Sequence, residues 1–376
     1  ISYPIFLVIA GLGVSYFSPS INLTIDPEMV FLIFLPPLLY EAAWYTSWHD
    51  FWRYKRPIML LAFGLVIFTS SIIAYAASSM IPGFTLALGF LLGGIISPPD
   101  AVAATSVLKG IKIPKRTLTI LEGESLLNDA SSLIVFRFAL AAVLTSQFDL
   151  KIATTNFFLV TFFGAGIGVA IGYIMYFLHR KLPTNSSIDT VLTLMTPYLA
   201  YLCAEQFHYS GVMAVVCCGL FLSYRSHEIF NYSSRMQATG VWETVTFILN
   251  GLVFFLIGLQ LTSIANNLYN FSVEQTVIYG LIISAVTIAL RLVWVFPATF
   301  LPRILSKKLR ETEPNPGWKS PVVVSWAGMR GVVSLASAMS IPLYLENGQP
   351  FPERDVILFI TFVVILVTLV FQGLTL

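Results

Sequence analysis

Apolar stretches of roughly twenty residues recur along the whole chain. A transmembrane α-helix needs about 20 consecutive, predominantly apolar residues to cross the hydrocarbon core of a bilayer. We place twelve such spans, at about 1–17, 29–47, 57–80, 83–108, 117–145, 156–178, 188–207, 210–224, 240–262, 275–301, 321–342 and 355–375. The sequence therefore predicts an all-α polytopic membrane protein, with residues 1–376 forming one transmembrane domain.

The composition excludes several other classes of protein. Hydrophobic residues make up 57% of the chain and charged residues only 11%, which is outside the range of ordinary soluble domains. The net charge is +2, and no basic face with interleaved aromatic residues suggests a nucleic-acid partner. Because the chain begins at Ile1 and ends on Leu376, trimming at both ends is compatible with it, as is a further N-terminal span or a cytoplasmic C-terminal tail.

Positive charges alternate between successive loops. Of the 21 Lys and Arg residues, 16 fall in one set of loops, 2 fall in the other set and 3 lie inside predicted spans. Lysine and arginine are enriched in cytoplasmic loops. The charge pattern therefore supports the span count and predicts that both termini of the chain face the cytoplasm.

Two of the predicted spans depart from a regular helix. The fourth includes Gly93-Gly-Ile-Ile-Ser-Pro-Pro-Asp100, and the eleventh includes Trp326-Ala-Gly-Met-Arg-Gly331. Proline removes a backbone donor and breaks a helix, so the backbone opens at membrane depth. Interrupted segments at comparable places in two halves of a chain are typical of inverted-repeat transporters. We expect two discontinuous helices that cross beside a site in the middle of the membrane.

The acidic run Glu122-Gly-Glu-Ser-Leu-Leu-Asn-Asp129 opens the fifth span. A charge at the centre of a bilayer costs about 2.5–3.5 kcal/mol or more, so it is retained when it is paired, hydrated or used. On a helix, Ser125 and Asp129 lie one turn apart, as do Glu124 and Asn128. Hard cations prefer oxygen ligands. We interpret Asp129 and Ser125 as the binding site of a cation such as Na⁺, with ion pairing of Asp129 to an intramembrane arginine as the alternative.

The broken fourth span offers further oxygen atoms. Ser97 and the carbonyl of Pro99 are candidate cation ligands. Asp100 is either a ligand or the cap of the half-helix that follows it, where a carboxylate favours the positive end of the helix.

Buried arginines are expected to support this site. Arg330 is predicted to pair with a buried carboxylate, and Glu124 is the first choice. Breaking such a pair costs about 3–5 kcal/mol because it leaves one charge uncompensated. Arg291 either plays a similar role or extends towards the membrane interface. Glu41, in the second span, either lines the ion route or lies near the lipid headgroups.

Four motifs together resemble one family, the monovalent cation:proton antiporter-1 group of NhaP/NHE-like sodium/proton antiporters. They are Phe34-Leu-Pro-Pro-Leu-Leu-Tyr-Glu41, Ile96-Ser-Pro-Pro-Asp-Ala-Val-Ala103, Glu122-Gly-Glu-Ser-Leu-Leu-Asn-Asp129 and Gly328-Met-Arg-Gly-Val-Val333. They occur in the order of the family and are spread over nearly the full chain. One departure is that the family often has Asp-Pro where this chain has Asp100-Ala101, so the carbonyl that would bind sodium falls on Pro99.

The resemblance implies a secondary transporter rather than an enzyme. Asp129 would bind Na⁺ and H⁺ alternately with Ser125 as a ligand, and Asn128, Glu124 and Arg330 would form a supporting network. Because Asn128 precedes Asp129, the resemblance further implies electroneutral exchange of one Na⁺ for one H⁺. A homodimer in the plasma membrane is expected, with no cofactor beyond the transported ions. K⁺ or Li⁺ in place of Na⁺ is the main alternative, followed at a distance by a cation channel and an intramembrane aspartyl protease.

Overall fold

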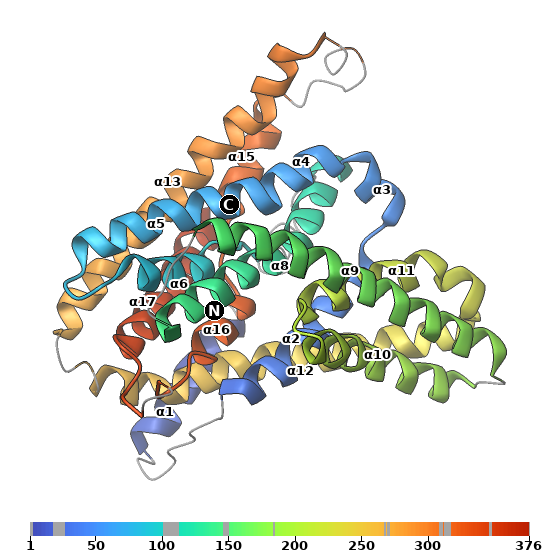
Figure 1. The fold of residues 1–376 in the computed structure, drawn as a ribbon, viewed down its shortest axis with the longest axis horizontal. Helices are drawn as coiled ribbons and strands as arrows, with labels where there is room; N and C mark the ends of the chain where they lie inside the picture. The colour runs from blue at the N-terminus through green and yellow to red at the C-terminus, as the bar shows by residue number, and fades with distance from the viewer. Residues whose placement is uncertain are drawn as a thin grey trace. The chain divides into compact units, whose positions relative to one another are not determined.

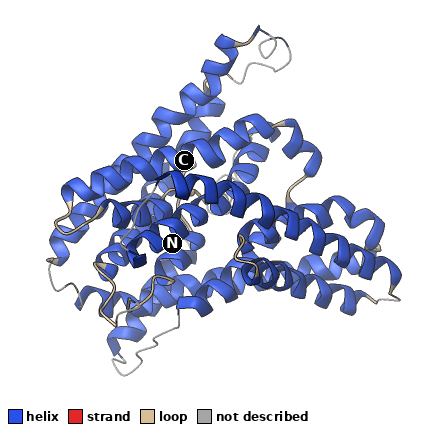
Figure 2. Ribbon diagram, viewed as in Figure 1, coloured by secondary structure: helices blue, strands red, loops and turns tan. Residues whose placement is uncertain are grey.

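The structure is a computed structural model that describes residues 3–17, 27–100, 113–145, 150–182, 185–266, 268, 271–307, 311, 317–345 and 348–375. These residues form helices and connecting loops, and no β-strand occurs among them (Figure 2). Seven of the helices are long and apolar enough to cross a membrane. They cover Lys55–Met80, Lys115–Thr145, Thr155–Lys181, Gly211–Ile229, Tyr232–Asn266, Val273–Leu305 and Arg354–Thr375. Three shorter apolar helices accompany them, so the all-α prediction is confirmed, whereas the count of twelve spans and the inverted repeat stay predictions.

The chain divides into two compact units. Unit 1 consists of Ile1–Thr24, Arg53–Gln147 and Phe254–Leu376. Its helices are α1 (Tyr3–Phe17), α4 (Lys55–Met59), α5 (Val66–Met80), α6 (Leu86–Ile96), α8 (Lys115–Thr145), α13 (Val273–Leu305), α15 (Lys319–Trp326), α16 (Val332–Met339), α17 (Arg354–Val367) and α18 (Gly373–Thr375), together with the end of α12 (Tyr232–Asn266); all but α18 are labelled in Figure 1. Two π-helical segments, η1 (Leu60–Leu65) and η2 (Thr368–Gln372), lie within the span that continues α4 and the span that continues α17.

Unit 2 consists of Ile25–Trp52 and Phe148–Val253. It contains α2 (Pro27–Tyr45), most of α3 (Trp48–Arg53), α9 (Leu150–Lys181), α10 (Ser186–Gln206), α11 (Gly211–Ile229) and the first part of α12 (Tyr232–Asn266). Its interior includes Tyr40, whose ring packs on those of Trp44 and Trp242, and a buried polar group in which Asp189 accepts a hydrogen bond from Ser234 at 2.7 Å. The predicted division of 188–224 into two spans agrees with separate helices α10 and α11.

Two glycines of α6 allow close packing of this helix against α5 on one side and against α8 on the other. A Cβ on Gly93 would lie 2.7 Å from the Ser70 carbonyl oxygen of α5, and one on Gly94 would lie 2.9 Å from the Phe136 nitrogen of α8. Both distances are below van der Waals contact, so any side chain would push the helices apart. This packing fixes where the C-terminal end of α6 meets α8.

The π-helical segment η1 is held by side chains from neighbouring helices. A π-turn frees backbone carbonyls from the regular hydrogen-bond ladder and is often found near functional sites. The carbonyl of Leu60 accepts from the indole N–H of Trp294 at 3.2 Å, and that of Ala62 accepts from the hydroxyl of Ser131 at 2.5 Å. Segment η1 is thereby fastened to α8 and α13.

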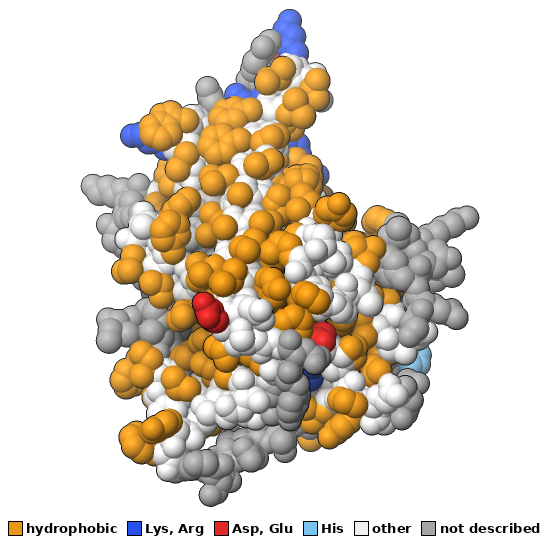
Figure 3. Space-filling view, turned by 90° about the vertical axis from the view of Figure 1, so that its left-hand side faces the viewer, with side chains coloured by type: hydrophobic (Ala, Val, Ile, Leu, Met, Phe, Trp, Pro, Cys, Tyr) orange, Lys and Arg blue, Asp and Glu red, His pale blue; other side chains and the backbone are white. Residues whose placement is uncertain are grey.

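The outer surface of the spans suits a lipid environment. On α13, Ile278, Leu281 and Val293 are exposed, and apolar side chains cover much of the surface drawn in Figure 3. In a bilayer such side chains face acyl chains rather than water, which removes the cost that they would have in a soluble protein.

Candidate functional site

The interruptions in two spans meet inside unit 1. Helix α6 ends at Ile96, directly before Ser97-Pro-Pro-Asp100, and α15 and α16 are separated by residues 327–331. The backbone N–H of Asp100 donates to the carbonyl of Met329 at 2.7 Å, which joins the two breaks. Residues 101–112, where the second half of the fourth span was predicted, lie outside the described residues, as does any cap that Asp100 provides for it.

Arg330 compensates the carbonyl end of α6. Its Nε donates to the carbonyl of Ile96 at 2.8 Å, and a terminal guanidinium nitrogen donates to the carbonyl of Ser97 at 3.4 Å. The last carbonyls of a helix have no partner within the helix and carry partial negative charge, so a cation there is stabilising. The side chain is 2% exposed, and its backbone N–H donates to the hydroxyl of Thr368 at 3.2 Å.

Asp100 lies against the start of α16. A Cβ on Gly331, the residue before α16, would fall 1.7 Å from Oδ2 of Asp100, so the carboxylate occupies the space that any larger residue would need. The N-terminal end of a helix carries partial positive charge, which favours a carboxylate at this point. Each break therefore supplies a charge that stabilises a helix end at the other break. Arg330 lies at the carbonyl end of α6, and Asp100 lies at the N-terminal end of α16.

Asn128 connects α8 to the broken segment. Its side-chain N–H donates to the carbonyl of Pro99 at 3.2 Å, and the residue is fully buried. The structure thus brings together the predicted site residues Ser97, Pro99, Asp100 and Asn128. Binding of a cation by the Pro99 carbonyl remains a prediction, and the bond from Asn128 uses one of the two lone pairs of that oxygen.

Two faces of α8 differ in solvent exposure beside the broken segment. Glu124 and Asn128 are 1% and 0% exposed, whereas Ser125 and Asp129 are half-buried. Within the described part of the chain, the Asp129 carboxylate has no hydrogen-bond donor or cationic partner, which disfavours the alternative of a structural ion pair. The Asp100 carboxylate is its electrostatic neighbour. Carboxylate and hydroxyl oxygens on one partly open face are suited to bind a hard cation or a proton.

Glu124 pairs with Arg291, which corrects the prediction that Arg330 is its partner. The two terminal nitrogens of Arg291 donate to the two carboxylate oxygens of Glu124 at 2.5 and 2.9 Å, and Nε donates to the carbonyl of Val324 at 3.0 Å. Arg291 reaches this position because Gly328 leaves room, since a Cβ there would lie 2.6 Å from the Arg291 side chain. The interface-directed alternative for Arg291 is excluded because the residue is 1% exposed.

Glu41 belongs to unit 2. It lies on α2 and has Glu243 of α12 as an electrostatic neighbour in the same unit. Its place on an ion route remains a prediction. Among the described residues, no group of three or more His, Cys, Asp and Glu side chains is arranged to hold a metal ion.

Sequence reasoning missed three residues that position the site. Thr368 accepts from the backbone of Arg330, Trp294 holds η1, and Ser131 connects η1 to α8. Each is an uncharged residue in an apolar run, where nothing in the local pattern separates it from ordinary packing residues.

Comparison with known proteins decides the family. The model of the transmembrane sodium/hydrogen exchanger family matches residues 1–376. The chain belongs to the sodium/hydrogen exchanger family. It is therefore a multi-pass integral membrane protein of a transporter family.

Two relatives and one solved structure show how this sodium/hydrogen exchanger chain compares with other members. A sodium, potassium, lithium and rubidium/H⁺ antiporter of Bacillus pumilus is 34% identical over 98% of this chain and 56% of its own length. The low-affinity Na⁺/H⁺ antiporter NhaS1 of Synechocystis is 34% identical over 100% of this chain and 68% of its own length. The sodium proton antiporter MjNhaP1 of Methanocaldococcus jannaschii shares the fold, with a TM-score of 0.78, 18% identity and coverage of 99% of this chain and 92% of that one. The chain thus spans little more than half the length of the Bacillus pumilus relative.

Proposed function

We propose that the protein is a secondary active transporter that exchanges Na⁺ for H⁺ by alternating access. Asp129 is the shared group: it holds either a proton or, with Ser125, a sodium ion. The observation that carries the proposal is the contrast on α8, where Glu124 is neutralised by Arg291 while Asp129 lies on the partly open face beside the broken helices. The relatives from Bacillus pumilus and Synechocystis are cation/H⁺ antiporters, which supports the same conclusion.

The supporting network keeps the other charges constant through the cycle. Glu124 and Arg291 neutralise one another, and Asp100 and Arg330 lie at opposite helix ends. The titrating and ion-binding step then falls on Asp129. In this proposal the protein works as a homodimer in the plasma membrane with both visible termini cytoplasmic, and Glu41 lies on the ion route.

Exchange is proposed to be electroneutral, with one Na⁺ for one H⁺, because Asn128 occupies the place of a second acid beside Asp129. Moving an uncompensated charge through 100 mV involves about 2.3 kcal/mol, so an electroneutral carrier does not respond to voltage. The exchange rate in proteoliposomes should stay constant when a potassium diffusion potential is imposed. A marked acceleration by voltage would contradict this stoichiometry.

A second candidate is exchange of K⁺ or Li⁺ for H⁺, and it is favoured by the similarity to the sodium, potassium, lithium and rubidium/H⁺ antiporter of Bacillus pumilus. Carboxylate and hydroxyl oxygens do not by themselves select one alkali cation. Proton flux in proteoliposomes with outward gradients of Na⁺, Li⁺ and K⁺ in turn tests both candidates. Flux driven by Na⁺ supports the main proposal, flux by K⁺ or Li⁺ alone supports the second, and no cation-driven flux would overturn both.

A further inference from the structure

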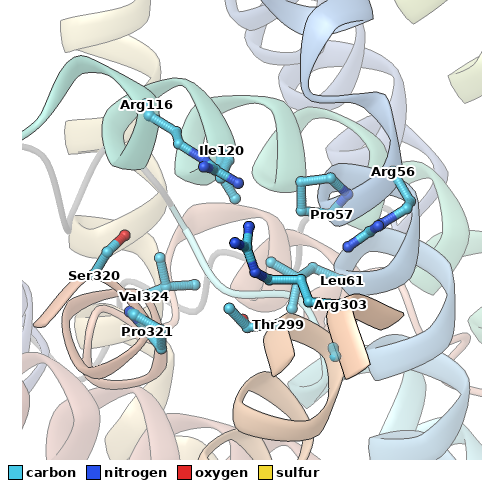
Figure 4. A pocket seen from close by; sticks show the side chains of 11 residues that line it. Arg56, Pro57, Leu61, Arg116, Ile120, Thr299, Arg303, Ser320, Pro321 and Val324 are labelled. Atoms are coloured by element: carbon cyan, nitrogen blue, oxygen red, sulfur yellow. The ribbon is translucent and has the colours of Figure 1, made fainter. Parts of the chain in front are cut away.

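Three arginines from three different helices line one pocket in unit 1. Arg56 comes from α4, Arg116 from α8 and Arg303 from α13, and Figure 4 shows their side chains directed into the same space. The pocket is partly open, and its cavity volume is about 40 Å³. Its remaining wall consists of Pro57, Leu61, Ile120, Ala298, Thr299, Ser320, Pro321 and Val324. Among the lining residues that the structure describes, none is acidic.

The arginines differ from the basic residues beside them. Arg56, Arg116 and Arg303 are half-buried, whereas Arg53, Lys55 and Lys115 on the same segments are exposed. Exposed cations are explained by the loop-charge rule alone. Three guanidinium groups turned into one pocket repel one another, and a cavity lined by charge of a single sign concentrates counter-ions.

The donor set suits a phosphate group. Arginine presents five N–H donors in a planar fork that matches phosphate oxygens in pairs, so each side chain can keep its protein contacts and still offer donors. The hydroxyl groups of Thr299 and Ser320 also line the pocket. A tetrahedral anion with several oxygens can contact more than one arginine at once, whereas a halide cannot use the fork geometry.

The three arginines of the pocket all lie near an end of a membrane-spanning helix. Arg56 and Arg116 lie in the first turns of the helical stretches Lys55–Met80 and Lys115–Thr145, and Arg303 lies in the last turn of α13. Leu61, Ile120 and Val324 form an apolar wall that belongs to one packed cluster. Basic pockets between transmembrane helices on the cytoplasmic side are suited to anionic lipid headgroups.

We propose that Arg56, Arg116 and Arg303 form a binding site for a phosphate group, carried by an anionic phospholipid headgroup or free in solution. The proposal does not depend on which cation the protein transports. Occupation of the site would join α4, α8 and α13, which also carry or contact Ser125, Asp129 and Arg291, so the ligand would stabilise the unit that holds the candidate ion site.

Binding to the full purified chain in detergent tests the proposal. The probes are short-chain phosphatidic acid, phosphatidylcholine of the same chain length and inorganic phosphate, followed by thermal unfolding and native mass spectrometry. Arg303→Gln and Arg116→Gln should each weaken the binding of phosphatidic acid about tenfold or more. Arg303→Lys should recover part of the loss, because it keeps the charge without the fork. Arg53→Gln is the matched control and should bind as the wild type does.

The probes also separate the two sources of phosphate. Displacement of phosphatidic acid by inorganic phosphate would show that free phosphate suffices, whereas binding of the lipid without such displacement would assign the site to the headgroup; either result supports the proposal. It is overturned if neither anionic probe binds, if phosphatidylcholine binds equally well, or if folded Arg303→Gln and Arg116→Gln proteins bind phosphatidic acid unchanged.

Discussion

Two faces of α8 each carry a carboxylate beside an uncharged polar side chain, but one face is buried and the other is partly exposed. On one, Glu124 and Asn128 are buried, with Glu124 held by both terminal nitrogens of Arg291 and Asn128 bonded to the Pro99 carbonyl. On the other, Ser125 and Asp129 are half-buried, and the Asp129 carboxylate has no cationic partner among the described residues. A carboxylate fixed by a paired arginine supports structure, whereas one on a partly open face is available to an ion. This contrast leads to four predictions.

The largest expected effect is on transport. Asp129→Asn should reduce sodium-driven proton flux in proteoliposomes to the background of empty vesicles, because the amide cannot take up a proton or balance the charge of a cation. Thermal unfolding should show a folded protein. Glu122→Gln is the matched control on the exposed part of the same helix and should retain flux. Full flux in reconstituted Asp129→Asn would place the site elsewhere.

The opposite face should respond through stability. Glu124→Gln leaves Arg291 buried without its counter-charge, and breaking a buried pair costs about 3–5 kcal/mol. Tryptophan-monitored thermal unfolding in detergent should show a large drop in the midpoint. Glu228→Gln, which breaks the exposed pair with Arg225, should leave the midpoint unchanged. Equal effects in the two variants would remove the distinction between the buried and the exposed pair.

The junction of the two breaks should be sensitive to a single methyl group. A Cβ on Gly331 would overlap Oδ2 of Asp100, so Gly331→Ala must displace either the carboxylate or the start of α16. We expect flux to fall about tenfold, which corresponds to about 1.4 kcal/mol in the transport barrier. Gly240→Ala, whose Cβ would meet nothing within 4 Å, should transport normally. If both variants transport alike, the contact between Asp100 and Gly331 has no functional role.

The smallest effect is expected at Ser125. Ser125→Ala removes one oxygen ligand from the open face and leaves the carboxylate in place. The sodium concentration that gives half-maximal exchange should rise a few-fold while the maximal rate stays near that of the wild type, because ligand loss weakens binding without removing the titrating group. A titration of flux against Na⁺ separates the two quantities. A lower maximal rate at unchanged half-saturation would argue against a ligand role.

The sequence predicts those parts of the fold that depend on local properties of the chain, such as apolar length and the position of proline. Long apolar stretches predict helices because a helix satisfies every backbone group within its own segment, without a neighbouring chain, in lipid. Pro98 and Pro99 remove two successive backbone donors and predict the end of α6, and the structure ends that helix at Ile96. The pair Pro36-Pro37 stays inside α2, so a double proline does not by itself end a helix in this chain. The exact ends of the helices and their packing partners cannot be predicted from local sequence, because they depend on the three-dimensional arrangement. The π-helical segment η1 likewise contains no proline or charged residue that would predict it.

The sequence predicts residues that the structure brings together at the two breaks, but it does not predict which arginine pairs with Glu124. Arg291 and Arg330 are both single cations in apolar runs, so charge alone does not decide which one meets Glu124. The three-dimensional arrangement decides it: Arg291 packs against Gly328 and reaches Glu124, while Arg330 is directed to the end of α6. In the same way, nothing in the sequence distinguishes Arg56, which lines a pocket, from exposed Lys55 beside it.

Competition of Na⁺ and H⁺ for Asp129 is tested most directly by proton release on sodium addition. Purified protein in weakly buffered detergent solution, at a pH where the site is protonated, should release up to about one proton per chain when Na⁺ is added, because a ligand that needs the ionised carboxylate displaces its proton. Asp129→Asn should release none, and Glu122→Gln should release as much as the wild type. Undiminished, sodium-dependent release from folded Asp129→Asn would contradict the account.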